Sequence, residues 1–298
     1  MSISDILKQL PETDREIQAK LPRPETPEEQ KRRRQQQQQF PESWGNASKF
    51  TGPDPAPARK LVAEVFLGGR KSILELIALL DNPGDYKPEY LLHCMAVYAD
   101  GKEQKLLTQT IASQLEKSQA RSILLRELQW VGSADVTRAL GKLLSDEKLC
   151  ADAASALTAI GGNAAANEFR KAFPKAPGKC RIIIAQNLGV LRDAKSVDAL
   201  RDALQEADTD LRLIAGWALA RIGDTQSIDP LIKMADAAQG NTRFKATNNV
   251  LLLAEALAGQ GKKSEAARIY THIQNTRTDP SEKYLREAAA RHLTTFML

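Results

Sequence analysis

Two tryptophans and three arginines are the residues of this sequence whose types and spacing could serve molecular recognition. Each stands two residues from a leucine that recurs along predicted helices; they are Trp130, Trp217, Arg126, Arg221 and Arg291. A tryptophan ring beside a guanidinium group can anchor a bound peptide or stack on a nucleic-acid base. We interpret the five as a candidate partner-binding set, with partial burial against a neighbouring helix as the alternative.

The sequence contains no set of residues typical of catalysis. His93, His272 and His292 fall in different parts of the chain, without a carboxylate at metal-binding spacing. Segments 68–72 and 261–264 resemble only the end of a phosphate-binding loop, because both lack its first glycine. No nucleophile motif stands out. We therefore expect a protein that is not an enzyme and that binds no metal or cofactor.

The three cysteines, Cys94, Cys150 and Cys180, are far apart and lack the spacing of a metal site. All three lie among apolar residues, so we expect free, inert, buried thiols, no disulfide and a reducing compartment.

No apolar run reaches the ~18 residues of a membrane span, and residues 1–25 contain no signal-peptide core. The expected location is the cytoplasm, away from membranes.

The net charge of +5 is spread thinly. Residues 1–55 contain nine basic and nine acidic residues, so the excess lies in residues 56–298. Nucleic-acid binding usually needs a concentrated basic stripe, and Glu127, Glu255 and Asp152 interrupt the candidate set. The acid-free cationic run at 170–181 is interpreted as a solvated turn, with an acidic partner surface as the alternative.

From about residue 58 the chain follows a helical repeat. A leucine recurs near the end of every second predicted helix, at spacings of 29, 31, 31, 38 and 36 residues: Leu128, Leu157, Leu188, Leu219, Leu257 and Leu293. Small residues stand three positions before nearly all of these leucines, which allows neighbouring helices to approach closely. Because one helical hairpin cannot bury its apolar faces alone, the hairpins must stack on one another.

These features predict that residues 56–298 form an all-α fold, a right-handed α-solenoid of about seven helical hairpins. The sixth repeat is the longest, and we expect its extra residues to form a long loop at 237–241. Residues 1–55 are predicted to be a partly disordered extension, because its two short helical patterns, at 4–10 and 27–39, lack a wide apolar face. Its aromatic segment 40–50 is expected to dock on the first repeat, or to be a motif for another protein.

One segment carries a family resemblance. The residues involved are Asp208, Leu211, Arg212, Ala215, Gly216, Ala218, Leu219, Ile222, Gly223 and Asp224. This pattern resembles the short HEAT-like repeat, also called the phycobilisome-lyase-type HEAT repeat. The resemblance is strongest over residues 134–224, extends to 58–133 and 225–295, and is absent from 1–55. It implies a solenoid fold but no single function, because such repeats occur in adaptors, lyases, hydroxylases and nucleic-acid enzymes.

The resemblance also bears on a second set of arginines. Arg121, Arg181, Arg212 and Arg286 each stand seven residues before a recurring leucine. In the HEAT-like consensus an arginine at this position resembles an internal ladder, which pairs with aspartate or carbonyl groups of the adjacent repeat. The alternative is a row of cations for phosphate groups or acidic peptides.

The sequence as a whole favours a non-catalytic scaffold or adaptor, monomeric or within a complex, that binds a protein partner on its concave face. The sequence does not identify that partner. The alternative is a nucleic-acid-binding protein similar to the HEAT-type DNA glycosylases, which hold tryptophan, aspartate and arginine in a basic groove. The HEAT-like hydroxylases bind two irons through paired His-Glu motifs, which this sequence lacks.

Overall fold

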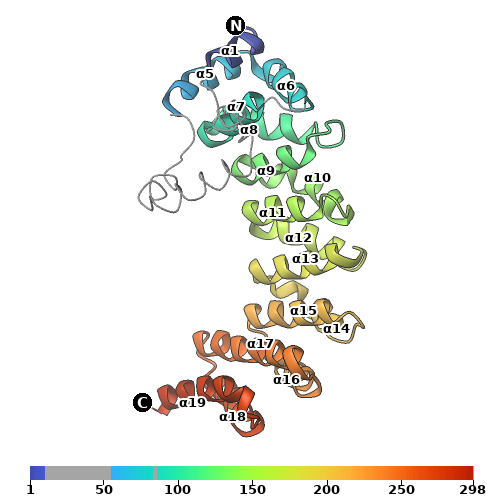
Figure 1. Cartoon of the computed structure of the whole chain (residues 1–298), viewed down its shortest axis with the longest axis vertical. Helices are drawn as coiled ribbons and strands as arrows, with labels where there is room; N and C mark the ends of the chain where they lie inside the picture. Colours follow the sequence, from blue (N-terminus) through green and yellow to red (C-terminus); the bar gives the residue numbers. More distant parts are fainter. Residues whose placement is uncertain (11–54, 83–85, 298) are drawn as a thin grey trace, which may run out of the picture. The chain divides into compact units, whose positions relative to one another are not determined.

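The computed structural model describes residues 1–10, 55–82 and 86–297. The regular secondary structure in these ranges is helical throughout, which confirms the predicted all-α class. The chain divides into two compact units, Met1–Gly132 and Ser133–Leu298, here called unit 1 and unit 2. Figure 1 shows the helices of each unit in chain order, from blue to green in unit 1 and from green to red in unit 2. None of the described helices is long and apolar enough to cross a membrane.

The helices described in unit 1 are α1 (Ile3–Gln9), α5 (Pro55–Leu67), α6 (Gly69–Leu79), α7 (Lys87–Tyr98), α8 (Gly101–Ala112) and α9 (Arg121–Val131). Helix α7 packs against both α5 and α9, while α6 packs against α8. The centre of this packing is apolar, and Leu91, Leu92 and Met95 of α7 are fully buried. Burial on this scale is the main favourable contribution to folding of the unit.

Helix α1 belongs to unit 1. Ser2 caps the helix by accepting a hydrogen bond from the Asp5 amide, and α1 contacts α5, α6 and α7. Its apolar residues Ile3, Ile6 and Leu7 are buried there. The narrow apolar face noted in the sequence is therefore sufficient, because three other helices supply the surface that it covers. The predicted docking of segment 40–50 lies outside the described residues.

In unit 2 the helices are α10 (Thr137–Gly141), α11 (Cys150–Ile160), α12 (Gly162–Ala172), α13 (Gly178–Val190), α14 (Val197–Ala203), α15 (Thr209–Ile222), α16 (Ile228–Ala237), α17 (Gly240–Gly259), α18 (Lys263–Thr276) and α19 (Lys283–Met297). They form helical hairpins such as α14–α15 and α16–α17. The second helices of successive hairpins, α11, α13, α15 and α17, pack one against the next. This arrangement is an α-solenoid, as predicted.

The recurring leucines of unit 2 explain the stacking. Leu157, Leu188, Leu219 and Leu257 are fully buried. Gly189 lies beside one of them, where α13 meets α15: a Cβ atom added there would lie 2.7 Å from the Ala218 Cα atom. Only a glycine allows the two helices to approach this closely.

Local signals explain why α15 is the helix with the strongest resemblance to the repeat. The Asp208 side chain caps its start by accepting hydrogen bonds from the amides of Asp210 (2.9 Å) and Leu211 (3.1 Å). Gly223 ends it in the left-handed conformation, at φ 78°. In the sequence pattern, Asp208 therefore marks the start of the helix and Gly223 marks its end.

The predicted long loop at 237–241 is wrong. Helix α16 ends at Ala237 and α17 begins at Gly240, so only two residues connect them. The extra residues of the sixth repeat instead lengthen α17, which has 20 residues. Its first turn lines a pocket described below.

The prediction of three free thiols is wrong for Cys150 and Cys180. These residues form a disulfide, with the Sγ atoms 2.21 Å apart and the Cα atoms 5.7 Å apart. Both lie in the first turn of a second helix, α11 and α13, and stacking brings such equivalent positions of neighbouring hairpins together. Their sequence separation of 30 residues is one repeat length. Cys94 is free and buried, as predicted. Because disulfides persist mainly in oxidising compartments, the cysteines no longer support a reducing one.

Candidate functional site

The more exposed of the two predicted recognition tryptophans is Trp130, at the end of α9 in unit 1. Its side chain is 60% exposed. The ring meets the His93 ring of α7 edge to face, with centroids 5.6 Å apart and an interplanar angle of 82°. Edge-to-face contact is a favourable geometry for two aromatic rings. The Trp130 ring is thus exposed to solvent while its position is fixed by contact with the His93 ring.

The His93 ring contacts the buried carboxylate of Glu127. Its Nδ1 atom lies 2.8 Å from Glu127 Oε2, and Glu127 is 0% exposed. Arg126 Nε donates to the other carboxylate oxygen at 3.1 Å, and its terminal nitrogen bonds Glu89 at 2.8 Å. A buried carboxylate is tolerated when it is paired and hydrogen-bonded in this way. We call His93, Arg126, Glu127 and Trp130, with Glu89, the Trp130 cluster.

The charged groups of the cluster contribute to raised pKa values of two residues, Arg126 and Cys94. The pKa of Arg126 is raised: burial alone would lower it, but the bonds and charges of Glu89 and Glu127 more than offset that effect. The pKa of the Cys94 thiol, next to His93 in sequence, is also raised. Burial is the main cause, a hydrogen bond with Tyr90 opposes it, and the Glu127 charge adds to it. The thiol is therefore protonated at neutral pH, which fits the predicted inert cysteine.

The other predicted tryptophan, Trp217 of α15 in unit 2, packs inside the solenoid. Its ring is half-buried, and a Cβ atom on Gly189 of α13 would come within 2.8 Å of its Cζ3 atom. Arg221 lies over the ring at 5.7 Å, a cation–π distance. Arg291 lies apart from this pair, on α19, and α17 comes between (Figure 1). The structure thus places Trp217 and Arg221 together but does not bring Arg291 to them.

The second arginine set lies in the first turns of helices: Arg121 in α9, Arg181 in α13, Arg212 in α15 and Arg286 in α19. Arg212 donates to the carbonyl of Glu206 at 2.8 Å, and Arg286 donates to that of Arg277 at 2.6 Å. Arg181 pairs with the Glu206 side chain of the next hairpin at 2.9 Å. These contacts favour the structural interpretation, with one change. Arg212 and Arg286 bind carbonyls within their own hairpins, and only Arg181 reaches the adjacent repeat.

Each of the three histidines has a carboxylate neighbour. Besides the Glu127 partner of His93, His272 Nε2 lies 3.0 Å from Asp236 and His292 Nε2 lies 3.6 Å from Glu255. The His292 ring also stacks on buried Tyr270, with centroids 4.9 Å apart. These partners come from neighbouring helices, so sequence spacing does not reveal them. In the described part of the chain, no three His, Cys, Asp or Glu side chains come together as metal ligands could.

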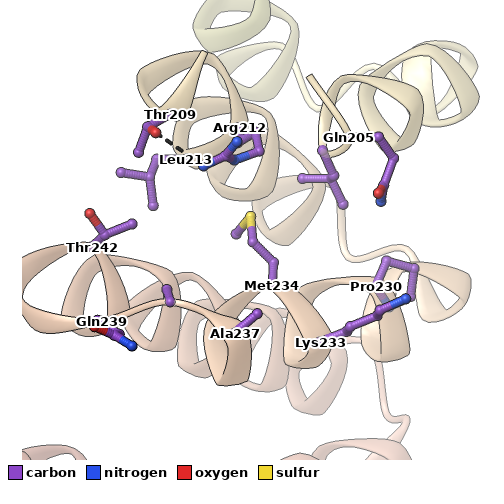
Figure 2. A pocket seen from close by; sticks show the side chains of 12 residues that line it. Gln205, Thr209, Arg212, Leu213, Pro230, Lys233, Met234, Ala237, Gln239 and Thr242 are labelled. Atoms are coloured by element: carbon purple, nitrogen blue, oxygen red, sulfur yellow. Dashed lines mark hydrogen bonds between the residues drawn. The ribbon is translucent and has the colours of Figure 1, made fainter. Parts of the chain in front are cut away.

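Unit 2 contains a pocket of about 460 Å³ that the sequence did not indicate. Figure 2 shows side chains of α15 facing side chains of α16 and of the start of α17 across it. The lining residues come from α15, from α16, from the first turn of α17 and from the residues that directly follow α14 and α16: Leu204, Gln205, Thr209, Arg212, Leu213, Pro230, Lys233, Met234, Ala237, Ala238, Gln239 and Thr242. The pocket combines two cations with several apolar side chains, and no carboxylate lines it.

The comparisons with known proteins bear on the fold. Residues 171–250 match the family model of HEAT repeats. This segment is therefore similar to HEAT repeats. The match includes residues 208–224 and so confirms the resemblance on which the sequence interpretation rested. No curated protein matches the chain.

Several solved structures are similar at low identity. An engineered protein solved by a structural genomics consortium has 16% identity and a TM-score of 0.43, over 81% of this chain and 74% of its own. The complex of CpcE and CpcF of phycocyanin lyase from Nostoc sp. PCC7120 has 16% identity and a TM-score of 0.35, over 77% of this chain and 92% of its own. At these scores we draw no conclusion from either structure.

Proposed function

We propose that this protein is a non-catalytic scaffold that binds a protein partner through the Trp130 cluster. The observation that carries the proposal is an exposed tryptophan on a fixed support. Buried ionic networks cost stability unless every member is paired, and here Glu127 is paired on both oxygens. The network holds His93 beneath the Trp130 ring. A rigid aromatic side chain next to an arginine is the typical composition of a binding hot spot.

The surface around Trp130 supports a protein partner. His93 and Val97 are one helical turn apart on α7, so they share a face of that helix, and Val97 is 46% exposed. An apolar area of this kind, edged by the charged Arg126 and Glu89, has the apolar centre and polar rim of protein interfaces. Trp217 is a weaker candidate because its ring already packs on Gly189.

The charge distribution favours protein over nucleic acid. Several arginines are engaged with carboxylates: Arg126 with Glu89 and Glu127, Arg170 with Asp193, Arg181 with Glu206, and Arg243 with Glu282. An arginine paired in this way contributes less to the potential that attracts phosphate groups. A cytoplasmic location stays a prediction, and the disulfide counts against it.

Affinity capture with the full-length chain tests this function. Partners captured by the wild-type protein from its source cells are quantified against Trp130→Ala and against the control Tyr284→Ala. Tyr284 is a similarly exposed aromatic residue, at 63%, on α19. We expect Trp130→Ala to reduce at least one partner by about tenfold or more and Tyr284→Ala to leave that partner unchanged.

Two outcomes would count against the proposal. If every protein captured by the wild type is captured equally by Trp130→Ala, the cluster is not the binding site. The nucleic-acid alternative is measured separately, by mobility shift of DNA and RNA at low and high salt. A shift that weakens steeply with salt would favour that alternative.

A further inference from the structure

We propose that the pocket of unit 2 binds an acidic peptide segment in which a carboxylate side chain is flanked by aliphatic residues. The site is separate from the Trp130 cluster and does not depend on it. Four features of the pocket support this ligand class: its two cations, its apolar surface, its side-chain amides and the helix that starts at its edge.

Lys233 and Arg212 provide the positive charge. Lys233 is exposed on α16, and no ion pair is found for it among the described residues. Arg212 stands on the facing helix, α15 (Figure 2). Its guanidinium is fixed in place, since it donates to the Glu206 carbonyl and to the Thr209 hydroxyl. A mobile ammonium group opposite an anchored guanidinium suits a carboxylate that enters between them.

The nearby acids do not neutralise this charge from within the pocket. Glu206, next to Gln205, is paired with Arg181 at 2.9 Å. Asp236, on the same helix as Lys233, is paired with Arg277 at 2.6 Å and with His272 at 3.0 Å. The cations of the lining are therefore available for an acidic group from outside.

The rest of the lining suits a peptide better than a bare anion. Met234 points from α16 toward α15, where Leu213 stands beside Arg212 (Figure 2). These apolar side chains can cover aliphatic side chains on either side of the carboxylate. Gln205 and Gln239 also line the pocket. A glutamine side chain both donates and accepts hydrogen bonds, so it can pair with a peptide backbone. The volume of about 460 Å³ is in the range of sites for ligands of this size.

The start of α17 adds to the positive potential. Its N-cap residue, Gln239, makes no side-chain capping bond, and Thr242 in the first turn lines the pocket. The amides at the start of this 20-residue helix favour a negative charge nearby. This turn is present because the extra residues of the sixth repeat extend the helix.

The experiment is fluorescence anisotropy with a labelled, end-blocked Leu-Glu-Leu peptide and the full-length chain. The matched probe is Leu-Gln-Leu, which differs only in its charge. We expect the glutamate peptide to bind about tenfold more tightly than the glutamine peptide, because a charge-assisted hydrogen bond is lost. Hexanoate and inorganic phosphate serve as unlabelled competitors and are expected to compete far more weakly than unlabelled peptide.

Four variants locate the binding. Lys233→Gln should weaken it about tenfold. Lys195→Gln removes an equal charge from an exposed position of η3 (Ala194–Ser196) and should leave the binding nearly unchanged. Ala237→Trp should block the pocket without a change of charge, and circular dichroism confirms that each variant is folded. Trp130→Ala should bind the peptide as the wild type does, so failure here and failure of the proposed function are distinguishable.

The proposal is overturned by any of three results. These are no binding of the glutamate peptide, equal binding by Ala237→Trp, and competition by hexanoate or phosphate as strong as that by the peptide. The last result would assign the pocket to a small anion rather than to a peptide.

Discussion

Two pairs of tryptophan and arginine with identical spacing have opposite environments in this protein. Arg126 and Trp130 are four residues apart on α9, and Trp217 and Arg221 are four residues apart on α15. Trp130 is 60% exposed above a histidine, whereas Trp217 is half-buried against Gly189. The facing residue decides the difference: a glycine makes room for a ring, and a supported imidazole holds a ring at the surface. An i, i+4 pattern alone does not separate recognition from packing.

The largest expected effect comes from the disulfide that holds α13, the helix against which Trp217 packs. Closing a loop of 30 residues restricts the unfolded chain, so reduction should lower the free energy of unfolding of unit 2 by about 3.5 kcal/mol. Urea denaturation followed by circular dichroism, with and without dithiothreitol, measures this. The double variant Cys150→Ala/Cys180→Ala should not respond to dithiothreitol.

A thiol count checks the same link directly. The chain has three cysteines. Urea-denatured protein should therefore show one reactive thiol without reductant and three after reduction. Three thiols without reductant would mean that Cys150 and Cys180 are not bonded, and α13 would then lack this restraint.

The next effect concerns the glycine that receives Trp217. Gly189→Val should destabilise unit 2 by about 2–3 kcal/mol, because the new side chain would overlap Ala218 and Trp217. Gly259→Ala, at the end of α17, is the control, since a Cβ atom there has no neighbour within 4 Å. Urea denaturation compares the two variants. Equal stability would show that α13 and α15 can separate freely and that Trp217 is not held by packing.

The tryptophans themselves give a smaller but more direct contrast. Trp217→Ala removes a half-buried ring from the α13–α15 contact and should cost about 2 kcal/mol of stability. Trp130→Ala removes an exposed ring and should cost no more than about 0.5 kcal/mol. Thermal and urea denaturation of both variants measure the difference. A larger cost at Trp130 would mean that its ring serves the fold rather than a partner.

The sequence predicts the solenoid because the same residue pattern recurs in successive hairpins. Leu157, Leu188 and Leu219 stand in the same position of successive hairpins, and all three are buried as this periodicity requires. Aligning the hairpins on these leucines also indicates the disulfide. Cys150 and Cys180 stand seven and eight residues before recurring leucines, so positions of adjacent hairpins that differ by a single residue contain the two thiols.

The candidate sites could be predicted only in part, because they depend on which residue faces which. Trp130 and Arg126 were selected from their spacing, but the buried carboxylate of Glu127 and its bond to His93 join α9 to α7, which are distant in sequence. The sequence does not indicate the pocket, because its pattern predicts a loop for the extra residues of the sixth repeat. They extend α17 instead, and its first turn closes one side of the pocket.

The smallest expected effect links the Trp130 cluster to the free thiol beside it. The Glu127 charge contributes to the raised pKa of Cys94, after the larger contribution of burial. Glu127→Gln should therefore lower that pKa and increase the thiolate fraction at a given pH, by less than about threefold. Because the other two cysteines are bonded, the rate at which a disulfide reagent modifies the native protein reports Cys94 alone.

The pH dependence of that rate separates an electrostatic effect from simple loosening of the cluster. Loss of the charge should move the profile to lower pH, whereas more frequent opening of α7 and α9 would raise the rate by the same factor at every pH. His93→Gln is the control, because it removes a partner of Glu127 and keeps the carboxylate. A profile that moves with His93→Gln but not with Glu127→Gln would contradict the role given to Glu127. The carboxylate beneath His93 and Trp130 would then not act on its surroundings through its charge.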